Sequence, residues 1–182
     1  RAYARFRCSL SGGLAPTGQD DTGGEVEDYY VGIVGNDLGD APASYGTQGA
    51  GAASHKIDPL TQRFLGLCVD TEPDGAPNAG ALGDDAAAGT SRVGSCFDDE
   101  DGVLFAGPLV SCRSTAITVS TPSAGGLLDA WVDFTLDGDF NDAGEHVFTN
   151  QSLTAGANAL SLAVPCTAVP GATYARFRLS TA

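Results

Sequence analysis

The densest group of acidic side chains lies in the stretch WVDFTLDGDFNDAGE, which begins at Trp131. Oxygen-bearing side chains occupy alternate positions of DGDFN, so a loop can turn them toward one centre, as a hard cation such as calcium requires. Five carboxylates within thirteen residues also repel one another unless a cation neutralises them. The alternative is a solvated turn in which Asp side chains bond to nearby backbone groups. We predict a calcium site, with Asp137, Asp139, Asn141 and Glu145 as ligands and Asp133 and Asp142 as further candidates.

A second acidic group is spread over the stretches CVDTEPDG, GDD and FDDEDG, between Cys68 and Gly102. These side chains could form another cation site between loops, or they could be a solvated, self-repelling surface. The residue pattern leaves both interpretations open. If a second metal site forms, its candidate ligands are Asp70, Glu72, Asp98, Asp99, Glu100 and Asp101.

The overall charge and the absence of catalytic motifs exclude several classes of function. The chain has 9 Lys and Arg against 23 Asp and Glu, a formal net charge of −14, which repels nucleic acid and anionic membranes. There is no apolar run that could span a bilayer, no initiator Met and no signal peptide, so we expect a mature or excised piece without membrane insertion. No nucleophile elbow, P-loop or H-E-x-x-H motif is present, and no motif surrounds His55 or His146. We therefore predict no enzymatic activity.

The elements that must position these residues are strands and turns. Apolar residues alternate with others in several short runs, and clusters of Pro, Gly, Asn and Asp separate the runs. We predict an all-β fold, an antiparallel β-sandwich of Ig-like or jelly-roll-like type, from about Val103 to the end, with long acidic loops and little helix. Residues 37–102 lack apolar periodicity and are expected to be loops that need covalent bridges. The alternating runs are Ala116–Ser120, Leu127–Phe134, Leu160–Val164 and Tyr174–Leu179.

The pentapeptide YARFR occurs twice, at Tyr3–Arg7 and at Tyr174–Arg178, and the two copies begin 171 residues apart. Such a spacing is plausible as the period of a repeated module. The first copy is followed by GEVEDY, which offers Glu25, Glu27 and Asp28. Arginines at alternate positions of one strand, facing carboxylates on its neighbour, make favourable cross-strand pairs.

Five cysteines without C-x-x-C spacing, and only two His, do not fit a zinc site. Disulfides in an oxidising, extracellular compartment are the better interpretation. Two cysteines bracket the loop-rich acidic segment, two lie near the ends of predicted strands, and Cys8 stands where the other YARFR copy has Leu179. We predict the bridges Cys68–Cys96 and Cys112–Cys166, with Cys8 unpaired.

Five motifs stand out along the chain: GGEVEDYYV (Gly23–Val31), GDAPASYGT (Gly39–Thr47), DDEDGV (Asp98–Val103), WVDFTLDGDFNDAGE (Trp131–Glu145) and GATYARFRLS (Gly171–Ser180). Together they resemble the GEVED-type repeat domain of large bacterial secreted and cell-surface proteins. The resemblance covers nearly the whole chain and implies an extracellular β-rich module, usually in tandem copies or attached to larger proteins, without a catalytic role. In the family's order GEVEDY follows YARFR at the end of the unit, whereas the only GEVEDY in this chain comes first.

This order predicts a chain cut out of phase with its repeat. Residues 1–34 would be the closing strands of one unit, and residues 37–182 the sandwich of the next. We expect a non-catalytic structural module of an extracellular bacterial fibre, surface layer or large surface protein, stabilised by calcium and joined head-to-tail to copies of itself. The alternative is a calcium-dependent adhesion module that binds glycan or a host surface. The residues expected at the inter-unit strand are Glu25, Val26, Glu27, Asp28, Tyr29, Arg176 and Arg178.

Overall fold

The computed structural model describes residues 2–33, 35–57, 63–83, 93–94, 100–122 and 126–181. It forms two compact units, Arg1–Val34 and Gly35–Ala182. The described residues are organised into antiparallel β-sheets with one short 3-10 helix, which confirms the predicted all-β class. No helix in these ranges has the length and apolar character needed to cross a membrane.

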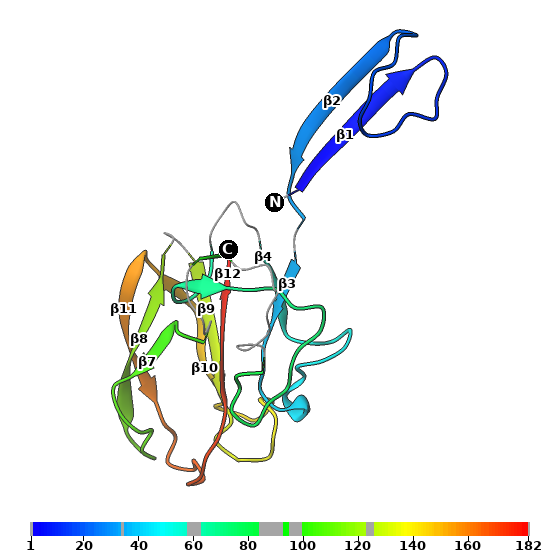
Figure 1. The fold of residues 1–182 in the computed structure, drawn as a ribbon. Coiled ribbons are helices and arrows are strands. Elements are labelled where there is room, and N and C mark those ends of the chain that lie inside the picture. The colour runs from blue at the N-terminus through cyan, green and yellow to red at the C-terminus, as the bar shows by residue number, and fades with distance from the viewer. Residues whose placement is uncertain are drawn as a thin grey trace. The chain divides into compact units, whose positions relative to one another are not determined.

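The Arg1–Val34 unit is a single β-hairpin. Strand β1 (Ala2–Ser9) pairs antiparallel with β2 (Gly24–Val31) (Figure 1). The register places Arg5 opposite Asp28. The side chains of both strands are largely exposed, because no second sheet of this unit covers either face. A two-stranded hairpin without such a cover is only marginally stable in water.

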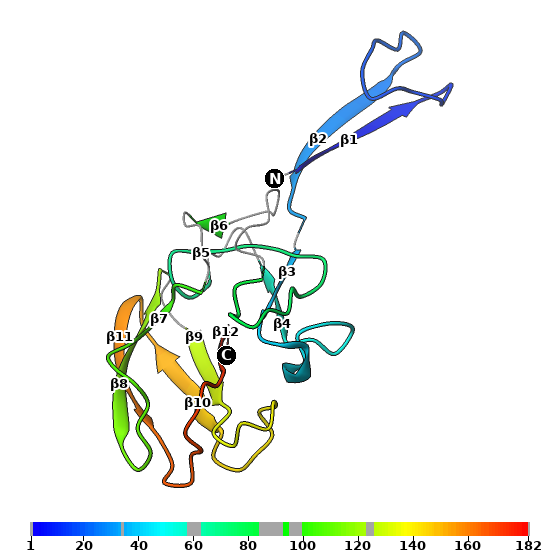
Figure 2. The same ribbon diagram turned by 60° about the horizontal axis from the view of Figure 1, so that its bottom comes forward.

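The Gly35–Ala182 unit is built around two three-stranded sheets packed face to face (Figures 1 and 2). One sheet has the strand order β10-β9-β12 and the other β11-β8-β7. In chain order the strands are β7 (Val103–Phe105), β8 (Ser114–Thr121), β9 (Gly126–Val132), β10 (His146–Leu153), β11 (Gly156–Ala163) and β12 (Ala175–Ser180).

The core between these sheets follows the predicted alternation. In β9, Leu128, Ala130 and Val132 are fully buried while the residues between them are partly exposed. Ile117 and Val119 of β8 meet them from the other sheet. Because successive side chains of a strand point to opposite faces, one apolar face per strand is enough to build this core. Phe177 and Leu179 of β12 pack against its border.

Residues 35–83 contain more regular structure than the sequence suggested. Strands β3 (Gly35–Leu38) and β4 (Ser54–Ile57) form a hairpin, with the 3-10 helix η1 (Ala43–Tyr45) between them. Strand β5 (Cys68–Val69) pairs with β6 (Val93–Gly94). The prediction of loops for this region missed the β3–β4 hairpin, because strands of four residues are too short to show a period of two.

The predicted Cys112–Cys166 disulfide is present and links the start of β8 to the segment after β11. Cys68 is buried and disulfide-bonded. Its predicted partner, Cys96, lies outside the described residues. Cys8 is a free, exposed thiol, as predicted.

Candidate functional site

The acidic loop after β9 is organised around the buried carboxylate of Asp133. This side chain has no exposed surface and accepts hydrogen bonds from the Tyr45 hydroxyl at 2.6 Å, the Leu136 N–H at 2.6 Å and the Gly138 N–H at 3.1 Å. Burial raises the pKa of Asp133, but the hydrogen bonds from Tyr45 and the loop backbone outweigh it and leave the pKa below its ordinary value. For Tyr45, burial and the bond to this carboxylate both raise the phenol pKa.

Glu145 holds the other end of the same loop. Its buried carboxylate accepts the Phe134 N–H at 2.9 Å and the Asp142 N–H at 3.2 Å. The Thr135 hydroxyl donates to it at 3.2 Å. Asp133 and Glu145 therefore fix the loop by satisfying backbone donors that would otherwise be left without acceptors.

The remaining predicted ligands lie at the outer part of the loop. Asp137, Asn141 and Asp142 are exposed, and Asp139 is partly exposed. The Asp139 N–H donates to Asp137 at 3.3 Å, and the Asn141 N–H donates to Asp139 at 2.7 Å, so the DGDFN stretch forms successive Asx turns. Within the described ranges no three His, Cys, Asp or Glu side chains are grouped so as to hold a metal ion. The calcium site remains a prediction.

The second acidic group is only partly described. Asp70 is buried, Glu72 is nearly so and accepts the Leu38 N–H, and Asp101 accepts the Leu67 N–H at 2.9 Å. Asp98 and Asp99 lie outside the described residues. The two interpretations of this group, a second cation site and a solvated surface, both remain open.

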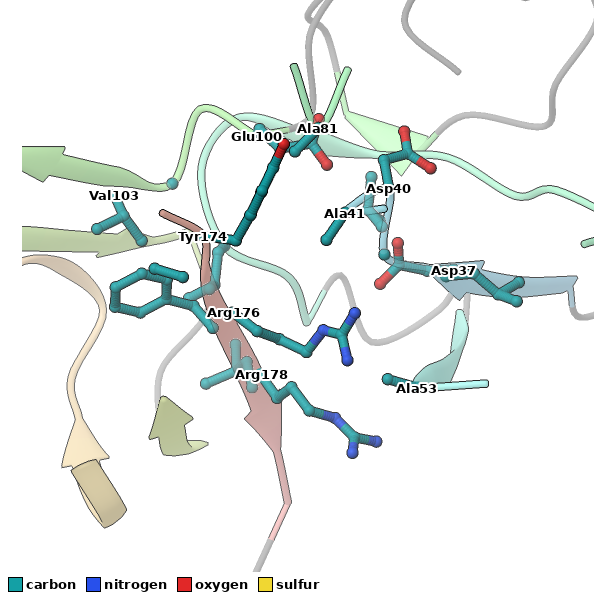
Figure 3. A pocket seen from close by; sticks show the side chains of 18 of the residues that line it. Asp37, Asp40, Ala41, Ala53, Ala81, Glu100, Val103, Tyr174, Arg176 and Arg178 are labelled. Carbon is teal, nitrogen blue, oxygen red and sulfur yellow. The ribbon is translucent and has the colours of Figure 1, made fainter. Parts of the chain in front are cut away.

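A cavity of about 630 Å³ lies along β12 (Figure 3). This strand is at the edge of its sheet, where β9 is its neighbour among the described strands. Residues from both faces of β12 line the cavity: Phe177 and Leu179 from one, Arg176 and Arg178 from the other. The β3–β4 hairpin forms another wall with Asp37, His55 and Lys56, and the sandwich contributes Val103, Phe105 and Leu109.

The two arginines of β12 reach toward the β3–β4 side of this cavity (Figure 3). Arg176 donates to the Tyr45 carbonyl at 2.8 Å, and its guanidinium lies 5.2 Å from the centre of the Phe140 ring. Its second terminal nitrogen, Nη2, is buried without a hydrogen-bond partner in the described part of the chain. Burial and the positive charge of Arg178 both lower the pKa of Arg176.

Arg178 bonds to the other end of the hairpin. It donates to His55 Nε2 at 2.9 Å and to the Ser54 carbonyl at 3.2 Å. His55 must offer a lone pair to Arg178, so its neutral form is favoured. Burial and the charge of Arg178 accordingly lower the His55 pKa. The sequence did not identify His55 or Phe105 as lining residues of a site, because no motif surrounds them and their contact partners are distant in sequence.

The same pentapeptide has a different environment in the hairpin unit. There Arg5 forms a bidentate ion pair with Asp28, with both N–O distances at 2.6 Å. Arg7 lies opposite Val26 and donates instead to the carbonyls of Ala15 and Gly18 at 2.7 and 2.8 Å. The expected pairing of arginine with a GEVEDY carboxylate therefore occurs at one of the two arginines of β1.

Trp131 lies on the outer face of its sheet. It is half-buried and stacks on the His146 ring, with centroids 4.4 Å apart and planes inclined by 10°. A second pocket of about 350 Å³ lies beside it, with Tyr45, Phe140, Asn141 and Arg176 also in its lining. Trp131 is therefore not a core residue.

Comparison with models of known protein families gives a match for part of the chain. Residues 127–182, which span β9 to β12, match the family model of the GEVED domain. This confirms the resemblance for those residues, and it covers the acidic loop and the second YARFR. No curated protein and no solved structure matches the chain.

Proposed function

We propose that the unit carrying this GEVED match is a non-catalytic structural module of an extracellular bacterial fibre, surface layer or large surface protein. Copies of the unit join head-to-tail, either in a tandem chain or by a strand shared between chains. Calcium bound at the acidic loop stabilises each copy. The function rests on assembly and on stability, and involves no reaction.

One observation carries this proposal: the hairpin unit presents apolar and aromatic side chains on both faces. Tyr3 and Phe6 are 79% and 62% exposed, and Val26, Tyr29 and Tyr30 are also exposed. In the sandwich, the residue equivalent to Phe6 is Phe177, which packs against the core. A hairpin with this composition is expected to be covered by another unit, because its own unit gives it no core.

The assembly state of the 182-residue chain tests the proposal. We expect sedimentation velocity to show association that increases with concentration, and electron microscopy to show linear assemblies, since a head-to-tail contact between different surfaces does not close. Arg176→Glu should reduce association, whereas Arg113→Glu, the same charge change at an exposed residue just before β8, should not. A chain that stays monomeric at millimolar concentration contradicts the proposal.

The pocket beside Trp131 supports a second candidate, a glycan-binding adhesion module. Its lining combines aromatic rings, Trp131, Tyr45 and Phe140, with polar side chains, Asp139 and Asn141, the kinds of group that contact sugar rings and hydroxyls. Saturable binding on a glycan array, lost in Trp131→Ala and retained in Trp131→Phe, would favour this candidate. A monodisperse chain that binds a glycan would favour the adhesion module over the structural module that assembles head-to-tail.

A further inference from the structure

The cavity along β12 has the position of a missing strand. A strand added at the edge of β12 away from β9 would continue the sheet, and its side chains would alternate between the two faces. The cavity is lined by side chains from both faces of β12, which fits that arrangement. Its walls are apolar on one side, with Val103, Phe105 and Leu109, and polar on the other, with His55 and Lys56.

The chain itself contains a template for the strand that fits here. β1 and β12 share the sequence YARFR, and β1 is paired with β2. In that pairing Arg5 lies opposite Asp28, Phe6 opposite Glu27 and Cys8 opposite Glu25. Carried over to β12, the same register places Asp28 opposite Arg176, Glu27 opposite Phe177 and Glu25 opposite Leu179.

Arg176 offers a hydrogen-bond donor for the Asp28 carboxylate that this register places opposite it. In β1 the equivalent arginine uses two nitrogens to hold Asp28. In β12 the Nη2 atom of Arg176 is buried and lacks an acceptor among the described residues. A buried donor without an acceptor costs free energy, so a carboxylate brought to this point gains a charge-assisted hydrogen bond.

The charge of the cavity also fits an acidic strand. Lys56, Arg63, Arg176 and Arg178 line it against Asp37, Asp40 and Glu100, so the lining carries an excess of one positive charge in a chain of net charge −14. The Gly24–Val31 strand carries three carboxylates and no cation. Among the acidic residues of the lining, Asp40 is already bonded to the N–H groups of Ala76 and Gly83 at 3.3 and 2.8 Å.

From this geometry we propose that the edge of β12 away from β9 is a receptor groove for the Gly24–Val31 strand of a second copy of this chain, bound antiparallel with Asp28 opposite Arg176. The proposal rests on the head-to-tail function above and specifies its contact. When the strand moves from β1 to β12, its backbone hydrogen bonds to β1 are replaced by backbone hydrogen bonds to β12. The move also adds contact between the apolar wall of the groove and Tyr29 and Val31, which share the strand face of Glu25 and Glu27 and have no such wall in the hairpin.

A labelled peptide tests the groove without requiring assembly. Fluorescein-labelled GEVEDYYV, the sequence of Gly24–Val31, is titrated with the 182-residue chain and its fluorescence anisotropy is measured. We expect saturable binding, and about a tenfold or greater loss of affinity for the Asp28→Asn peptide, the size expected for one hydrogen bond to a charged group. The Glu27→Gln peptide loses the same charge from the opposite face and should bind within about twofold of the parent peptide.

The chain variant Arg176→Gln completes a double-mutant cycle. The difference in affinity between the parent peptide and the Asp28→Asn peptide should disappear in this variant, whereas a merely structural role of Arg176 would weaken both peptides equally. Absence of saturable binding, or equal losses for Asp28→Asn and Glu27→Gln, overturns the proposed groove. Peptide binding by a chain that stays monomeric would contradict the assembly function alone, and assembly without peptide binding would contradict the groove alone.

Discussion

Asp133→Ala is expected to destabilise the Gly35–Ala182 unit by about 4 kcal/mol, because it removes the acceptor of five hydrogen bonds at once. The N–H groups of Leu136 and Gly138 would be left without a partner, and the Tyr45 hydroxyl would lose its bond to the carboxylate. An unsatisfied buried donor costs about 1–3 kcal/mol, and the loop can move to solvate part of this group. Urea denaturation followed by tryptophan fluorescence measures the change, because Trp131 is the only Trp and lies in β9.

Asp137→Ala is the matched control for this substitution. Asp137 is exposed and accepts one long hydrogen bond within the loop, so in calcium-free buffer its loss should cost less than about 1 kcal/mol. Equal losses of stability for the two variants would show that Asp133 does not organise the loop.

The same carboxylate predicts a dependence of stability on pH. The folded-state pKa of Asp133 is lowered, so its contribution is present above the unfolded-state pKa and is lost as the pH falls through the folded-state value. The free energy of unfolding of the wild type should therefore fall below about pH 4. The fall should be shallower in Asp133→Asn, which does not titrate.

Calcium is expected to raise the free energy of unfolding of this unit by about 3 kcal/mol at a free concentration about one hundred times the dissociation constant. The proposed ligands are the side-chain oxygens of Asp137, Asp139 and Asn141 at the outer part of the loop, together with the Glu145 carboxylate. Asp142 is a candidate for a further ligand. Asp133 and Glu145 already accept backbone N–H groups, so their first role is to shape the loop. Urea midpoints of chelator-treated protein, measured with and without added calcium, report the change.

A paired substitution localises the calcium effect. Asp137→Asn with Asp139→Asn keeps the size of both side chains and should abolish the response to calcium. Asp20→Asn with Asp21→Asn removes two charges from the hairpin unit and should leave the response to calcium unchanged. A midpoint unaffected by millimolar calcium would contradict the proposed site.

The alternation of apolar residues was sufficient to predict the sandwich strands. Leu128, Ala130 and Val132 occupy one face of β9 and are all fully buried, because the period of side chains in a strand is two whatever the rest of the fold does. The Cys112–Cys166 bridge was also predicted, because both residues lie at the ends of such strands.

The candidate sites could be predicted only in part, since they depend on contacts between distant segments. Tyr45 reaches Asp133 across 88 residues of sequence, and Arg178 reaches His55 across 123. No local pattern encodes such contacts. The acidic loop was correctly placed after a strand, but its spacing could not show that Asp133 would be buried and saturated by hydrogen bonds.

Disulfide trapping between copies tests most directly the claim that one unit donates its strand to the edge of the next. In a Cys8→Ser background, a chain carrying Leu179→Cys is mixed with one carrying Glu25→Cys, because Cys8, the counterpart of Leu179 in the first YARFR copy, lies opposite Glu25 in the β1–β2 register. The control mixture replaces Glu25→Cys by Val26→Cys, whose side chain points to the other face of the strand. The account predicts a mixed disulfide dimer, seen by mass spectrometry under non-reducing conditions, in the first mixture and little in the second. Equal yields in the two mixtures, or no dimer in either, would contradict it.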